Sequence, residues 1–128
     1  MIFKRNEGFR FAFGEPLHAS FVILIDGKPQ NLEKTQYPCE IQDVSPRGMK
    51  MFSNVEIGED TTKLVQLEIH FILDVTKIRA VGEIVWSKKV IDGFQYGLIF
   101  DKQPIVEELI VSELKGRRKK ELQRSKTS

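Results

Sequence analysis

Apolar and polar residues alternate with period two along most of the first hundred residues, as in β-strands with one buried face. The clearest case is Leu64–Leu73 (LVQLEIHFIL), where every second residue from Val65 onward is apolar. Turn-forming residues separate six such segments, and this spacing is typical of a sandwich or barrel. The expected strands are Leu17–Ile25, Cys39–Asp43, Gly48–Ser53, Leu64–Leu73, Ile78–Ser87 and Phe94–Asp101.

The period changes after Asp101. Pro104 suits a first helical turn, and Glu107 and Glu108 suit the positive end of a helix dipole. Apolar residues then follow at helical spacing, namely Ile105, Val106, Leu109, Ile110 and Leu114. We therefore expect a mainly β fold, a sandwich or barrel, with a C-terminal α-helix that covers an open end or face. Gly116 either ends this helix or loosens it.

Length and composition describe an ordinary soluble protein. A chain of 128 residues with 41% hydrophobic and 30% charged residues predicts one domain with a core of its own. Cys39 is the single cysteine, so a reducing compartment is expected. Charge begins at Lys4, and no apolar run approaches the roughly 20 residues that span a bilayer. We expect a cytoplasmic protein.

Charge is distributed unevenly between the body and the end of the chain. Residues 115–128 contain seven basic residues and one acidic residue, a net charge of +6, so the remainder carries −4 because the whole chain is +2. We divide the chain into a domain over residues 1–114 and a basic tail over 115–128. Such a tail can attract nucleic acid, an anionic membrane or an acidic protein, but it is more often a solvated helix end.

The stretch Ile41–Met51 contains the densest turn chemistry in the chain. Asp43 and Ser45 can bond backbone N–H groups, and Gly48 allows conformations closed to other residues. One interpretation is a tight connection between two strands. The other is a polar cup for a ligand, and turn composition does not decide between them.

Catalytic motifs are missing. There is no phosphate-binding loop, no HExxH pair and no nucleophile elbow, so we expect a binding module and not an enzyme. His18 has no second ligand at metal-binding spacing, so we expect a structural role and no metal. His70 shares a face with polar residues and is predicted to be solvated. Near the N-terminus, Arg5 and Arg10 lie among phenylalanines, which fits either surface charge or a planar, phosphorylated ligand.

The order of these features resembles the PilZ domain, a bacterial receptor for the second messenger cyclic di-GMP. Asp43-Val44-Ser45-Pro46-Arg47-Gly48 matches the family motif [Asp/Asn]-x-Ser-x-x-Gly. The segment ending in Val85-Trp86 is similar to the family's Val-Trp strand, and Phe94–Phe100 is similar to its last strand. The resemblance covers about residues 3–112 and implies a six-stranded antiparallel PilZ-like β-barrel with a C-terminal helix.

The resemblance also implies a site and a mechanism. Arg5 and Arg10 would pair with the phosphates of cyclic di-GMP, while Asp43, Ser45 and Gly48 would meet a guanine. No cofactor besides this ligand is implied. Binding would order the N-terminal arm, the segment Lys4–Arg10 that contains both arginines. The ordered arm would signal to an unidentified protein partner, such as a component of motility or exopolysaccharide machinery.

The arm departs from the family pattern. The family's second motif is Arg-x-x-x-Arg; Arg10 fits its second position, but Asn6 stands where the first arginine is expected and Arg5 lies one residue earlier. Asn6 lacks the charged fork that pairs with phosphate. The alternative function is therefore a PilZ-fold protein-interaction module that does not bind the nucleotide.

Overall fold

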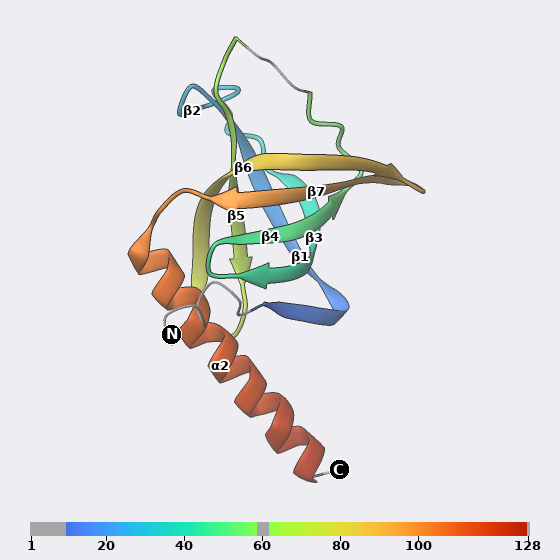
Figure 1. Cartoon of the computed structure of the whole chain (residues 1–128), viewed down its shortest axis with the longest axis vertical. Helices are drawn as coiled ribbons and strands as arrows, with labels where there is room; N and C mark the ends of the chain where they lie inside the picture. The colour runs from blue at the N-terminus through green and yellow to red at the C-terminus, as the bar shows by residue number, and fades with distance from the viewer. Residues whose placement is uncertain (1–9, 59–61, 128) are drawn as a thin grey trace.

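The computed structural model describes residues 10–58 and 62–127, with side chains up to residue 124. Figure 1 shows a strand-rich body with one long helix across its end. The strands of this described part are β1 (Phe11–Ile25), β2 (Lys28–Pro29), β3 (Tyr37–Ser45), β4 (Gly48–Ser53), β5 (Val65–Ile72), β6 (Lys77–Val90) and β7 (Gly93–Phe100). The helix is α2 (Pro104–Thr127).

The strands form a closed antiparallel barrel. Their order is β2-β1-β3-β4-β7-β6-β5, and β1 also pairs with β5, which joins the two ends of the sheet. β2 is a two-residue extension paired with the end of β1. The six expected segments are the six long strands, so the predicted six-stranded barrel with a C-terminal helix is confirmed.

Strand β1 is longer than the pattern predicted. It begins at Phe11 instead of Leu17. Phe11 and Ala12 pair with Val44 and Asp43, and regular pairing resumes at Leu17 after an irregular section. The N-terminal part of β1 therefore lies against the end of β3, directly beside the Asp43 turn.

The core is made of the inward faces of all six long strands. Among its buried side chains are Phe21, Ile41, Met49, Met51, Leu67, Ile69, Ile78 and Leu98. Cys39 is also buried, and burial raises the pKa of its thiol to about 12. The thiol therefore stays protonated at neutral pH and behaves as a small apolar group.

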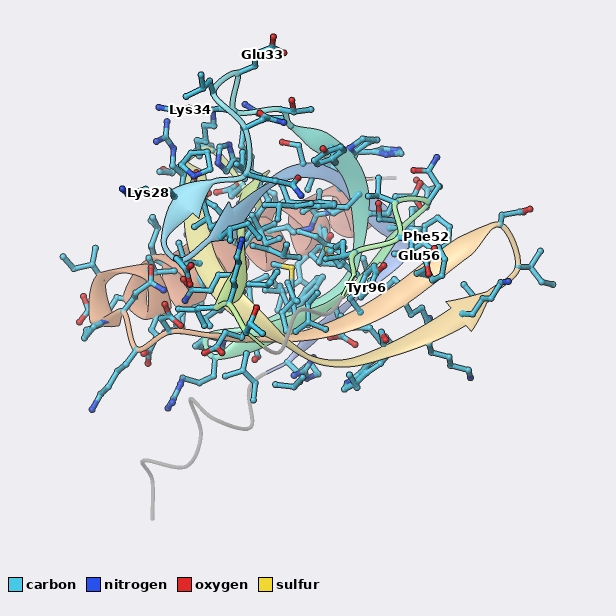
Figure 2. All side chains as sticks on the ribbon, turned by 90° about the horizontal axis from the view of Figure 1, so that it is seen from above. Lys28, Glu33, Lys34, Phe52, Glu56 and Tyr96 are labelled. Carbon is cyan, nitrogen blue, oxygen red and sulfur yellow. The ribbon has the colours of Figure 1, made fainter. Side chains whose placement is uncertain are left out.

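Tyr96 ties the segment after β4 to the barrel. It is the largest fully buried side chain, and its hydroxyl accepts the N–H of Ile57 and donates to the carbonyl of Val55, each at 2.9 Å. Figure 2 labels Tyr96 close to Phe52 and Glu56, at the end of β4 and in the segment after it. Burial raises the pKa of Tyr96, so the hydroxyl remains a donor at neutral pH.

Helix α2 begins at Pro104, as predicted, and docks through part of its apolar stripe. Ile110 and Leu114 are buried, whereas Ile105 is exposed. The helix does not end at Gly116. A Cβ atom on Gly116 would lie 2.4 Å from Asp74 Oδ2, so the glycine permits close approach of the helix to the β5–β6 turn. The helix continues through the basic residues to Thr127.

Glu113 is the main polar contact between α2 and the barrel. Its side chain is only 6% exposed, and Oε1 accepts three consecutive backbone N–H groups of the β5–β6 turn, from Asp74 (3.1 Å), Val75 (2.9 Å) and Thr76 (2.8 Å). Lys120 pairs with Asp74 at 2.7 Å. A carboxylate held by adjacent backbone donors is a strong, directional anchor.

His70 is not solvated, so that prediction is wrong. Its side chain is 9% exposed, and Nε2 lies 2.7 Å from Glu68 Oε1. β5 lies between β1 and β6 in the closed barrel, and the cross-strand neighbours of His70 are Ser20 on β1 and Arg79 on β6. Alternation correctly placed His70 opposite the core, yet its side chain is almost fully buried there, next to Glu68.

We predict that Glu113→Ala destabilises the protein by about 2–3 kcal/mol, because it removes the buried carboxylate that accepts three backbone N–H groups of the β5–β6 turn. Chemical denaturation followed by circular dichroism measures the change. Glu108→Ala, at an exposed position on the same helix, is the control and is expected to change stability by less than about 0.5 kcal/mol. Equal stability of the two variants would show that Glu113 does not anchor the helix.

Candidate ligand-binding site

The turn between β3 and β4 is fixed by its own serine. Ser45 is 2% exposed; its hydroxyl accepts the N–H of Arg47 and donates to the carbonyl of Gly48, each at 3.3 Å. Gly48 is needed for a different reason, since a Cβ atom there would lie 2.3 Å from the carbonyl oxygen of Leu98 on β7. Both residues therefore determine the shape of the turn and the seating of β4 on β7.

Asp43 is the charged centre of the site. It lies on β3 opposite Ala12 of β1 and Lys50 of β4, and its side chain is 15% exposed. Arg10 donates a hydrogen bond from Nη1 to Asp43 Oδ1, and Lys50 Nζ lies 3.7 Å from Oδ2. One carboxylate thus holds two cations at the surface of the barrel.

Arg10 reaches Asp43 because the N-terminal part of β1 pairs with the end of β3. Its side chain is 50% exposed, so the guanidinium keeps donors available to a ligand. Arg5, the other predicted arginine, lies outside the described residues, as does Asn6. The structure therefore brings Arg10, Asp43, Ser45 and Gly48 together.

The row of paired residues continues across two more strands. Lys50 on β4 is opposite Gly97 on β7, and Gly97 is opposite Trp86 on β6. A Cβ atom on Gly97 would lie 2.0 Å from Trp86 Nε1, so the indole occupies the space that the glycine leaves empty. Trp86 is 43% exposed, and the neighbouring Val85 is exposed as well.

Lys50 and Trp86 were not predicted as site residues. Alternation in β4 places Lys50 between two inward methionines, Met49 and Met51, and this signal was sufficient to put it on the outer face. Trp86 is different, because its place beside Gly97 depends on the register between β6 and β7. That register includes an irregularity between Ile84 and Trp86 that the sequence does not reveal.

These groups suit a ligand that is both anionic and aromatic. Arg10 and Lys50 supply charge-assisted donors, and Asp43 supplies acceptors. Trp86 offers a partly exposed ring face on which a planar group can stack. Among the described residues, no group of three or more histidines, cysteines or carboxylates is arranged to hold a metal ion. No helix in the described part of the chain is long and apolar enough to span a membrane.

Comparison with known protein families shows which family the chain belongs to. The PilZ domain family model matches residues 5–115, which include all seven strands and the first half of α2. The chain therefore belongs to the PilZ domain family.

A solved structure with the same fold agrees with this assignment. The chain is similar to the PilZ domain with c-di-GMP of YcgR from Escherichia coli, at a TM-score of 0.61 and 13% sequence identity. The similarity covers 94% of this chain and 96% of that chain, and it is a likeness of fold. None of the curated proteins matches this sequence.

We predict that Gly97→Ala displaces the indole of Trp86, because the added methyl group takes its space. Trp86 is the single tryptophan, so fluorescence reports on it alone; the expected result is a red-shifted emission and a loss of about 1–3 kcal/mol in stability. Gly14→Ala is the control, since nothing lies within 4 Å of a Cβ atom at Gly14. Unchanged emission in Gly97→Ala would contradict the contact.

Proposed function

We propose that this PilZ domain is a receptor for cyclic di-GMP that signals to a protein partner. The observation that carries the proposal is the row of Asp43 on β3, Lys50 on β4 and Trp86 on β6, which continues through Gly97 of β7. Arg10, just before β1, joins this row through its hydrogen bond to Asp43. Cyclic di-GMP has two phosphates and two guanines, and this row supplies cations, a carboxylate and an aromatic face. The c-di-GMP-bound PilZ domain of similar fold supports the same ligand class.

Each residue has a distinct part in the proposed binding. Arg10 and Lys50 pair with phosphate oxygens, and Arg5 adds a second guanidinium from the arm. Asp43 accepts hydrogen bonds from guanine N–H groups when Arg10 and Lys50 turn from Asp43 toward the phosphates. Trp86 stacks on a base or on the ribose next to it. Ser45 and Gly48 hold the turn in the shape that presents Asp43.

The proposed signal to the partner depends on the position of Arg10 and Arg5 at the start of the chain. Arg10 immediately precedes β1, so a ligand that engages Arg10 and Arg5 fixes the arm against the barrel. The ordered arm then presents a new surface to a protein partner, and machinery of motility or exopolysaccharide production is the partner class we propose. A ligand shifts such an equilibrium only by its difference in affinity between the two states.

The second candidate function is an interaction module that does not bind the nucleotide. Two observations favour it: Asn6 replaces the first arginine of the arm motif, and both oxygens of Asp43 already have cationic partners. A ligand must therefore compete with Arg10 and Lys50 for this carboxylate. In this case the ion pairs of Asp43 with Arg10 and Lys50 only stabilise the barrel and bind no ligand.

Isothermal titration of the full chain with cyclic di-GMP at constant ionic strength decides between the two functions. We expect saturable binding. Absence of heat at micromolar protein, with the fold intact by circular dichroism, would reject the receptor and favour the interaction module.

We predict that Arg10→Ala weakens binding of cyclic di-GMP by about 10- to 150-fold, which corresponds to the 1.5–3 kcal/mol of a charged hydrogen bond. Arg79→Ala is the matched control. Arg79 is an exposed arginine opposite His70 on another part of the barrel, and its removal is expected to leave the affinity unchanged. Equal losses in both variants would mean that only overall charge matters.

A further inference from the structure

A groove runs between the Asp43–Gly48 turn and helix α2. It has a volume of about 530 Å³, and its lining includes Pro46 from the turn and Pro104, Glu107, Glu108, Val111 and Lys115 from the helix. This volume is within the range of about 300–1,000 Å³ found for small-molecule sites. Pro46 directly follows Ser45, so the groove begins where the site described above ends.

The helix presents an ordered series of groups to this groove. Pro104, Glu108, Val111 and Lys115 follow one another at intervals of three or four residues and so share one face of the helix. Glu107 and Glu108 lie near the helix N-terminus, and Lys115 lies about 10 Å further along the axis. The groove therefore has a carboxylate end, an apolar middle and a cationic end.

This order matches a guanine nucleotide. The Watson–Crick edge of guanine carries two adjacent N–H donors, and a carboxylate is an acceptor that can take both. Pro46, Pro104 and Val111 offer apolar surface to the planar ring, and Lys115 offers a donor to phosphate. Adenine has an acceptor at the corresponding ring nitrogen, so it would face the carboxylate with a lone pair.

We propose that this groove receives the second guanine of the cyclic dinucleotide, with Glu107 and Glu108 reading its Watson–Crick edge. The inference rests on the proposed receptor function and deepens it. Asp43 holds one guanine on the barrel surface, and the dinucleotide extends past the turn so that the other guanine enters the groove. Guanine specificity at both ends then comes from carboxylates on two different elements.

Neutralising Glu107 and Glu108 has opposite effects on affinity depending on whether the two glutamates bind the guanine or only lie near the ligand. The ligand carries two negative phosphates, so a nearby glutamate that makes no hydrogen bond to it repels it. Neutralising Glu107 and Glu108 would then tighten binding or leave it unchanged. If the two glutamates accept guanine N–H groups, neutralising them weakens binding despite the relief of repulsion.

The test compares Glu107→Gln/Glu108→Gln with Glu33→Gln/Glu56→Gln, which makes the same change in net charge. Glu33 and Glu56 are exposed and lie on loops after β2 and β4, at the end of the barrel away from α2 (Figures 1 and 2). Titration with cyclic di-GMP and with cyclic di-AMP is measured for both variants and for the unchanged chain. Thermal unfolding establishes that each variant is folded.

We predict that Glu107→Gln/Glu108→Gln binds cyclic di-GMP roughly tenfold more weakly than the control variant, the loss of one charged hydrogen bond. We also expect its preference for the guanine over the adenine dinucleotide to shrink by a similar factor. Affinity equal to or tighter than that of the control would overturn the groove assignment and leave the receptor function standing. No binding by the unchanged chain would instead reject the receptor function.

Discussion

Pairing of β1 with two neighbours at once is the constraint on which the rest of the structure depends. The C-terminal part of β1 pairs with both β3 and β5 and so closes the sheet into a barrel. Its N-terminal part, beyond the irregular section, pairs only with the end of β3 and carries Arg10 to Asp43. One strand thereby fixes the core and positions the first charged residue of the site.

The register of the remaining strands completes the site. In the sheet, β3, β4, β7 and β6 lie side by side in that order. Their pairing places Lys50, Gly97 and Trp86 in the same row as Asp43. Gly97 in this row leaves room for the indole of Trp86, so an aromatic surface lies in the same row as Lys50 and Asp43. Helix α2 is then anchored by Glu113 at the β5–β6 turn, and this anchoring positions its other face beside Pro46.

The sequence predicts the parts of this arrangement that depend on local periodicity and turn chemistry. Alternation located the six strands because each inward face is buried, and the Asp43–Gly48 motif located the turn. The row that joins Lys50 to Trp86 could not be predicted, because it depends on the pairing of β4 with β7, which are far apart in the chain, and on the irregularity between Ile84 and Trp86.

Two residues show where the local sequence pattern is not sufficient. His70 follows the polar half of a regular alternation, yet its side chain is buried and lies beside Glu68. Gly116 is a common helix-ending residue, but here Asp74 occupies the space beside it and the helix continues. In both cases the surroundings in the folded protein, which the local pattern does not contain, decide the outcome.

The central claim is that the row from Asp43 to Trp86 is the surface that binds cyclic di-GMP. Two-dimensional NMR of the isotope-labelled full chain during titration with the dinucleotide tests it most directly. We expect saturable shifts of the Lys50 and Gly97 amides and of the Trp86 indole N–H, with little change at His18 and Arg79. Shifts confined to other parts of the barrel, or none at all, would contradict the claim.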